Sequence, residues 1–183
     1  DGVRLSDDEK ALLNKLQEAT AILQFKLESQ LIKRRPDFQL EHRDVLHFIN
    51  FSEKTIKLGT EVYELTDFQA PTVNPEQPES LTAEEEKIIS HLLNNFRSSD
   101  KLKRHVEFLQ EKGAMYLSYN GNLLIHGCLP LHENGDFKSF TVNKEAHAGR
   151  DLLDFFDQEV RKCLAHPENS TDLATDLMWY LWV

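Results

Sequence analysis

Two short apolar runs on either side of Asn120-Gly121 form the clearest structural signal in the chain. Asn-Gly is the dipeptide that most readily takes positive φ at both central positions of a type I′ turn. The pattern therefore predicts a β-hairpin with strands at 116–119 and 122–126. Because residues 123–125 are all apolar, we expect the second strand to be covered on both faces.

Apolar residues three and four positions apart predict a long amphipathic helix near the start of the chain. Ser6-Asp-Asp-Glu9 has the spacing of a capping box, which satisfies the exposed amides of a helix start. Pro36 cannot continue a helix, so we expect the helix to end near Arg34, after about 28 residues. We expect the apolar stripe to pack against the rest of the chain, with a coiled-coil dimer as the alternative.

Helical spacing and strand-like runs of apolar residues also predict the next elements of the first half of the chain. A short helix is expected over 41–50, followed by a second hairpin that turns at Gly59-Thr60. Residues 66–80 contain three prolines and show no periodicity, so they are expected to form an irregular loop.

In the second half of the chain, helix signals alternate with turn signals. Thr82-Ala-Glu-Glu85 is another capping box. A further helix is expected to start at Ser98 or Ser99 and to stop at Gly113 in a left-handed conformation. The remaining elements are a short strand and two helices, expected at 137–142, 151–164 and 172–182.

These elements give an α+β arrangement for the chain on its own, in three parts. Residues 1–65 hold the long helix, the short helix and a hairpin, 66–80 form the proline-rich loop, and 81–183 hold the later helices and the central hairpin. At this length we expect one structural domain. The last seven residues, 177–183, are all apolar or aromatic, so we expect a piece of a longer protein that is cut within its core.

Charge and composition narrow the class of partner. The chain has 21 basic and 31 acidic residues in 183, a net charge of −10, which argues against nucleic acid or an anionic membrane as a partner. No apolar run approaches the roughly 20 residues of a membrane span, and no signal peptide is recognisable. Cys128 and Cys163 have neither metal-ligand nor disulfide spacing. We expect a reduced, cytoplasmic protein.

The residues offer few candidates for chemistry. There is no glycine-rich phosphate loop, no zinc cluster and no Gly-x-Ser-x-Gly elbow. Lys33-Arg34-Arg35 could hold a phosphate, but basic residues at a helix end also simply complement the helix dipole. Eight histidines are scattered along the chain. His42 and His47, five apart, are not expected to share a helix face.

His126 is the histidine placed best for a functional role. It ends the apolar strand of the central hairpin, and Gly127 beside it leaves the backbone uncovered. His132 is the only other histidine near this predicted sheet. A hydrogen-bonded core histidine is the alternative interpretation of His126. One imidazole binds a catalytic divalent ion poorly, so further ligands would have to come from elsewhere.

The run Tyr119-Asn-Gly-Asn-Leu-Leu-Ile-His-Gly-Cys-Leu-Pro-Leu131 closely resembles the class 3 fructose-1,6-bisphosphatases of bacteria. The resemblance extends over nearly the whole chain. It includes Ile22–Glu28, Arg34–Phe38, Ala70–Pro75, Ser99–Leu102, His105 and Asp176–Trp182. It implies an α/β protein of the calcineurin-like metallophosphoesterase superfamily, in which this chain would be part of a four-layer sandwich with a largely helical insert.

The resemblance also implies a metal site. The superfamily holds two metal ions through five ligand blocks, of which only the lone histidine at a strand end has a match here, in His126. Gly127 and Cys128 would form the wall of the site. The other blocks are expected outside this chain, and no catalytic or sugar-binding residue is carried over.

The activity implied for the intact enzyme is hydrolysis of fructose 1,6-bisphosphate to fructose 6-phosphate and phosphate, a step of gluconeogenesis. A divalent metal, manganese or magnesium, would support it, with the sugar bisphosphate as small-molecule partner and a homo-oligomer as a further expectation. We expect the chain alone to be inactive. The alternatives are a metallophosphoesterase acting on another phosphoester, and a non-catalytic helical interaction or regulatory module.

Overall fold

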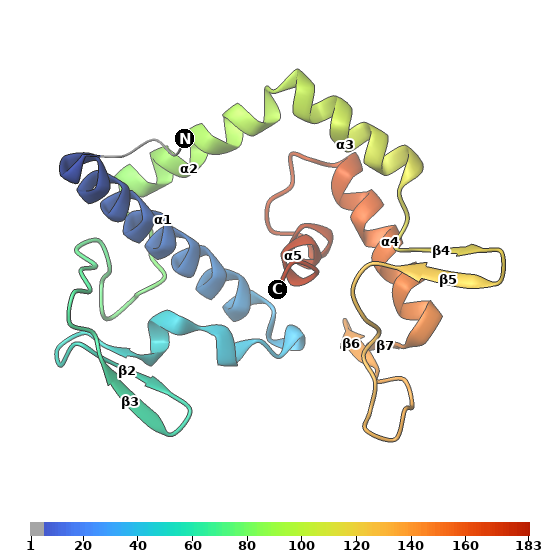
Figure 1. Ribbon diagram of the computed structural model, residues 1–183, viewed down its shortest axis with the longest axis horizontal. Coiled ribbons are helices and arrows are strands. Elements are labelled where there is room, and N and C mark those ends of the chain that lie inside the picture. The colour runs from blue at the N-terminus through green and yellow to red at the C-terminus, as the bar shows by residue number, and fades with distance from the viewer. Residues whose placement is uncertain (1–5) are drawn as a thin grey trace. The chain divides into compact units, whose positions relative to one another are not determined.

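The computed structural model describes residues 6–183, and its internal contacts divide the chain into two units (Figure 1). The first unit ends at Leu92 and the second spans Leu93–Val183. Helices and small antiparallel sheets make up both units, which confirms the mixed character expected of the chain. Among residues 6–183, none of the helices has the length and apolar character that a membrane crossing requires.

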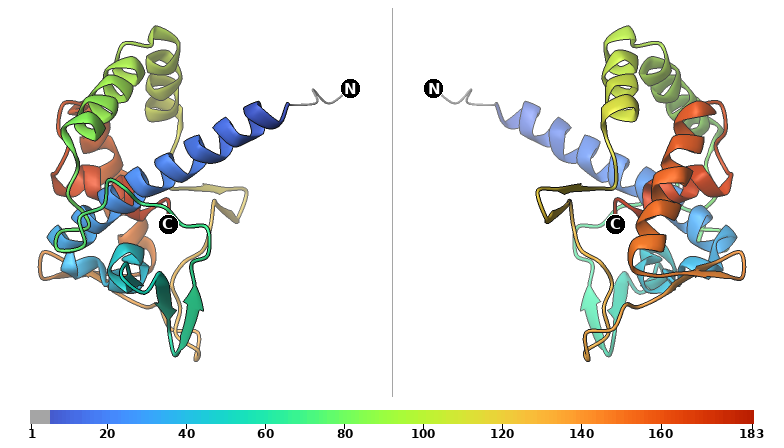
Figure 2. Two further views of the ribbon diagram at one scale, coloured as in Figure 1. Left: turned by 90° about the vertical axis from the view of Figure 1, so that its left-hand side faces the viewer. Right: turned by 90° about the vertical axis from the view of Figure 1, so that its right-hand side faces the viewer.

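Helix α1 (Asp7–Arg34) has the bounds expected from the sequence. The capping box is formed, because the Ser6 amide donates to Glu9 Oε2 at 2.7 Å and the Glu9 amide donates to Ser6 Oγ at 3.3 Å. Figure 2 shows α1 as one continuous helix. The expected apolar stripe is mostly uncovered: Leu12 and Leu27 are 59% and 37% exposed, whereas Leu31 is 6% exposed. The expected packing of this stripe against the rest of the chain is therefore seen only near the end of α1.

The segment after α1 differs from the single helix expected over 41–50. It forms three short 3-10 turns, η1 (Pro36–Phe38), η2 (Glu41–Arg43) and η3 (Val45–Phe48). The backbone at Asp44, with φ −76° and ψ 71°, is not helical and separates the last two turns. Strand β1 (Ile49–Asn50) follows η3 directly. The prediction of one helix was therefore wrong.

The second hairpin is confirmed. Strands β2 (Thr55–Leu58) and β3 (Glu61–Glu64) pair antiparallel, and β1 adds a third strand in the order β1-β2-β3. Gly59 lies in the connecting turn with φ +62°, a backbone conformation that glycine adopts without steric cost.

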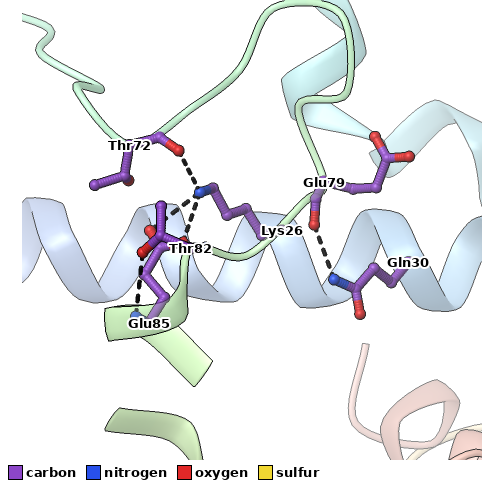
Figure 3. Close-up of polar contacts among 6 residues, drawn as sticks. All are labelled: Lys26, Gln30, Thr72, Glu79, Thr82 and Glu85. Atoms are coloured by element: carbon purple, nitrogen blue, oxygen red, sulfur yellow. Dashed lines mark hydrogen bonds and ion pairs between the residues drawn. The ribbon is translucent and has the colours of Figure 1, made fainter. Parts of the chain in front are cut away.

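The proline-rich segment 66–80 contains no helix or strand, as expected, and it is fixed against α1. Figure 3 shows Lys26 and Gln30 of α1 reaching this segment. Lys26 Nζ donates to the Thr72 carbonyl oxygen at 2.7 Å, and Gln30 Nε2 donates to the Glu79 carbonyl oxygen at 2.8 Å. Polar side chains of the long helix thus satisfy carbonyl groups of an otherwise irregular loop.

Helices α2 (Ala83–Arg97) and α3 (Asp100–Lys112) begin at the residues that the sequence indicates. The Thr82–Glu85 capping box is formed, and Ser99 Oγ accepts from the Leu102 amide at 3.3 Å. Gly113 ends α3, but with φ −82° it is extended, so the expected left-handed stop was wrong. A Cβ at Gly113 would lie 2.4 Å from the Leu109 carbonyl oxygen, so close approach of the backbone favours glycine here.

The second unit continues with two hairpins and two helices. Their bounds are β4 (Tyr116–Tyr119), β5 (Asn122–Ile125), β6 (Phe140–Val142), β7 (Glu145–His147), α4 (Gly149–Ala165) and α5 (Leu173–Tyr180). The strand expected over 137–142 is shorter than predicted. Its partner β7 was not predicted, although Asn143 and Lys144 between the strands both have positive φ, as a two-residue hairpin turn requires.

The core of the second unit lies between α4, α5 and the β6–β7 hairpin. Its buried apolar side chains are Val142, Leu152, Leu153, Phe156, Ala174 and Leu177. The Phe140 ring lies 4.7 Å from Tyr180 and 5.6 Å from Phe156, centroid to centroid. This packing fixes α4, the helix that lies beside the central hairpin.

Candidate functional site

The central hairpin β4–β5 is formed as the sequence predicts. Tyr116 pairs with Ile125 at its open end and Tyr119 pairs with Asn122 at the turn. Asn120 and Gly121 have φ values of 49° and 75°, so both take the positive φ expected of them. Strand β5 ends at Ile125, one residue earlier than expected.

His126 follows β5 directly and is exposed. Within residues 6–183, its ring takes part in no hydrogen bond or ion pair, so it is not the hydrogen-bonded core histidine of the alternative interpretation. Gly127 has φ +92°, and a Cβ there would meet no atom within 4 Å. Backbone conformation therefore favours glycine next to His126, and the space beside the ring is open.

The covering expected for β5 is absent from the described residues. Leu123 and Leu124 are 55% and 52% exposed, and Leu117, which pairs with Leu124, is 56% exposed. The prediction of a strand covered on both faces was therefore wrong for this chain. Within the second unit, α4 packs mainly on α5.

A shallow, open pocket of about 390 Å³ lies at the open end of the hairpin. Its lining comes from the end of α3 and from both strands, namely Lys112, Ala114, Met115, Tyr116, Leu117, Leu124, Ile125 and His126. His126 and Lys112 bring the polar groups to an otherwise mainly apolar wall. The pocket therefore places an unpaired imidazole at the rim of an accessible hollow.

The two cysteines differ in environment. Cys128, two residues after His126, is an exposed free thiol, whereas Cys163 on α4 is partly buried. Burial raises the pKa of the Cys163 thiol, although Thr175 within 3.9 Å partly opposes this. Cys163 therefore behaves as a packing residue, and Cys128 lies on the accessible surface next to the candidate ligand.

The other histidines lie on separate elements of the chain. His91 and His105 are exposed on α2 and α3, and His132 is exposed in a turn where its amide donates to the Asp136 carbonyl oxygen at 2.8 Å. His42 and His47 both line an open pocket of about 740 Å³ in the first unit, because the segment that carries them is not a regular helix. The two residues lie on separate 3-10 turns and so share no helix face.

Sequence reasoning did not single out His147. Its Nδ1 lies 2.8 Å from Asp151 Oδ2, and its ring stacks on Phe155 at 4.1 Å. Its Nε2 is buried and has no hydrogen-bond partner in the described part of the chain. The spacing of four between His147 and Asp151 at the start of α4 was the available signal.

No three His, Cys, Asp or Glu side chains within residues 6–183 are grouped closely enough to hold a metal ion. A metal ion bound by His126 would therefore need its other ligands from outside the described residues.

Comparison with known proteins gives a consistent result. A family model described as Firmicute fructose-1,6-bisphosphatase matches residues 1–183. A fructose-1,6-bisphosphatase class 3 from Lactococcus lactis subsp. lactis is 99% identical over 183 residues, which are 100% of this chain and 29% of the relative. Relatives of the same name from Streptococcus agalactiae serotype Ia and Bacillus velezensis are 50% and 47% identical, over 96% of this chain and 27% and 28% of their own lengths.

The chain thus spans less than a third of the length of the curated relatives that it matches. No solved structure matches it significantly.

Proposed function

Since the chain belongs to the Firmicute fructose-1,6-bisphosphatase family, we propose that it is a part of such an enzyme and that His126 is one ligand of its metal centre. In the whole protein the reaction would be hydrolysis of fructose 1,6-bisphosphate to fructose 6-phosphate and phosphate, a step of gluconeogenesis. The remaining ligands would lie in the segments that this chain lacks relative to the longer proteins.

The observation that carries this proposal is the exposure of His126 and the lack of a partner for its ring. The residue is exposed at the end of a strand, and in residues 6–183 nothing occupies its ring nitrogens. Neutral histidine is the commonest metal ligand among side chains, although manganese and magnesium take most of their ligands as oxygen atoms. Because Gly127 has no side chain and the space around it is open, other groups could approach His126 from that side.

His126 could therefore supply one nitrogen ligand to a divalent metal such as manganese, whereas magnesium would depend on oxygen ligands from outside the described residues. Such ions supply charge that stabilises the phosphoryl oxygens during displacement. The contribution of this chain would be to hold the His126 imidazole in place, with Gly127 and Cys128 forming the adjacent wall. No general acid or base is assigned within the described residues.

The exposed hairpin supports the same proposal. The side chains of Leu117, Leu123 and Leu124 are all more than half exposed, whereas large apolar side chains gain about 1.5–3 kcal/mol when they are buried. In the proposed arrangement, β4 and β5 join the metallophosphoesterase sandwich, and segments from the rest of the protein cover them. The segments that cover the hairpin would also bring the other metal ligands to His126.

The test is the His126→Ala variant in a full-length class 3 enzyme that carries this chain. Bound manganese, measured by elemental analysis after dialysis, should fall, and turnover of fructose 1,6-bisphosphate should drop by about 100-fold or more. His132→Ala, which removes an exposed loop histidine, is the matched control and should leave both unchanged. If His126→Ala retained wild-type metal and turnover, the chain would instead be a non-catalytic module.

A substrate panel separates the two enzymatic alternatives. The proposal predicts that the full-length protein prefers fructose 1,6-bisphosphate over other phosphoesters. A preference for another phosphoester, with metal still lost in His126→Ala, would keep the ligand role and change the substrate.

A further inference from the structure

One face of α4 carries four charged side chains that point to the start of the central hairpin. Arg150, Asp154, Asp157 and Arg161 are spaced four, three and four residues apart, which places them on the same side of the helix. We call them the anchoring face of α4. Each makes a polar contact with another member of the face or with the segment from Gln110 to Tyr116.

Arg161 binds the end of α3. Its Nη1 donates to the Gln110 carbonyl oxygen at 2.6 Å, and its Nη2 donates to the Gly113 carbonyl oxygen at 3.0 Å. The first of these is a carbonyl of the last turn of α3, where the helix itself leaves acceptors unpaired. Arg161 Nε also donates to Asp157 Oδ2 at 2.7 Å, which holds the guanidinium group in the orientation that reaches both carbonyls.

The two aspartates bind the residues that lead into β4. Asp157 Oδ1 accepts from the Met115 amide at 3.3 Å. Asp154 Oδ1 accepts from the Tyr116 hydroxyl at 2.9 Å, and Arg150 Nε donates to the same hydroxyl at 3.0 Å. The anchoring face therefore contacts four residues, Gln110, Gly113, Met115 and Tyr116. The last of these is the first residue of the hairpin.

These contacts lie at the end of the hairpin from which His126 emerges. Tyr116 pairs with Ile125, the residue before His126. Figure 1 shows this open end next to α4, with the Asn120-Gly121 turn pointing away. In the described residues β4 and β5 form a sheet of two strands only, and an isolated two-stranded hairpin is marginally stable in water. Within this chain, the position of the hairpin therefore depends on what holds its open end, and in the full-length protein the same contacts would act beside those of the covering segments.

We propose that the anchoring face of α4 positions His126, with Arg161, Asp157 and Asp154 acting through the first strand of the hairpin. The inference rests on the proposed ligand role of His126. These side chains are positioning residues, because they touch Gln110, Gly113, Met115 and Tyr116 and not His126 itself. Removing a group that is hydrogen-bonded directly to a metal ligand lowers metal affinity by about 10- to 100-fold, so residues that act through the backbone should have a smaller effect in the same direction.

Two variants of the full-length enzyme test this role with little change in volume. Arg161→Lys keeps the positive charge but loses the planar fork that reaches two carbonyl groups at once. Tyr116→Phe keeps the ring and removes only the hydroxyl bound by Asp154 and Arg150. Lys162→Gln is the matched control, because Lys162 follows Arg161 on α4 and its ion pair is with Glu159, outside the anchoring face.

Manganese binding is measured directly by electron paramagnetic resonance of the free ion, together with kinetics at several manganese concentrations. We expect Arg161→Lys and Tyr116→Phe to raise the manganese dissociation constant, by up to about 10-fold, the lower end of the effect of removing a direct partner of a ligand. At saturating manganese, turnover should recover and KM for fructose 1,6-bisphosphate should stay unchanged. Lys162→Gln should bind manganese as the wild type does.

The outcomes separate the inference from the proposed function. Wild-type manganese affinity in both variants, with metal lost in His126→Ala, would overturn the positioning role and leave the ligand role intact. Metal retained in His126→Ala would overturn the proposed function itself. An equal loss in Lys162→Gln would show a general effect of disturbing α4 and would also overturn the inference.

Discussion

Lys26 on α1 and Glu85 on α2 form an ion pair that is almost completely removed from solvent. Lys26 Nζ lies 3.0 Å and 2.8 Å from the two carboxylate oxygens of Glu85, and the two side chains are 0% and 8% exposed (Figure 3). Glu85 also accepts from the Thr82 amide at 2.7 Å. One carboxylate therefore caps α2 and holds the middle of α1.

We predict that Lys26→Met destabilises the attachment of α1 by about 3–5 kcal/mol, because it leaves the Glu85 charge buried without a partner. Local opening of α1, measured by hydrogen exchange in the full-length protein, gives this free energy. Adding Glu85→Gln should recover most of the loss, since glutamine keeps the capping role. Lys33→Met is the control: its partner Glu79 is 2.6 Å away but Lys33 is 47% exposed, so the cost should be about 0–1 kcal/mol.

The same pair predicts how the first unit responds to acid. Burial opposes ionisation of Glu85, but hydrogen bonds from Lys26, Thr72 and Thr82 together outweigh it, so the pKa of Glu85 lies below its ordinary value. A lowered folded-state pKa gives stability that is present above the unfolded value, about 4.3, and is lost as pH falls through the folded value. Protection of α1 amides should therefore persist at pH 5 and decrease below about pH 4. Glu85→Gln should reduce this dependence, with a smaller part left by Glu79, whose pKa is also lowered by Lys33 of α1. An unchanged profile would contradict the assignment.

Local signals in the sequence were sufficient to predict the bounds of helices and turns wherever neighbouring residues set the backbone conformation. The capping box at Ser6, the stop before Pro36 and the Asn120-Gly121 turn each depend on a few adjacent residues, and each was predicted with nearly correct bounds. The 3-10 turns around Asp44 were missed because their apolar spacing fits an α-helix equally well.

The surroundings of the candidate site were less predictable. The contacts of Arg161 and Asp154 with the hairpin join residues 38 to 51 positions apart, so no local pattern reveals them. The run of apolar residues in β5 predicted cover on both faces, but a sequence pattern does not show which segment supplies that cover. His126 was found through its place at a strand end and through the family resemblance, not through a cluster of ligands.

The exposed leucines of the hairpin give a prediction about the whole protein. Leu124 is 52% exposed here, so Leu124→Ala in the chain alone should change the free energy of unfolding by less than about 0.5 kcal/mol. In the full-length protein, where we propose that β5 is covered, the same change should cost about 2–5 kcal/mol. Denaturant unfolding of both forms measures the difference, and equally small effects would contradict the proposed covering.

Gly127 and Gly121 provide a matched pair for testing the candidate site. Gly127, two residues after the end of β5, and Gly121, in the hairpin turn, have positive φ values of +92° and +75°, and at neither would a Cβ meet an atom within 4 Å. Replacing either with alanine should therefore impose backbone strain of about 1–3 kcal/mol without a steric clash. The two glycines differ in place, because Gly127 adjoins His126 and Gly121 lies in the turn at the far end. If His126 is a metal ligand, both variants should lose similar thermal stability in the full-length enzyme, and only Gly127→Ala should also lose manganese affinity. Equal manganese affinity in the two variants would count against a metal site beside Gly127.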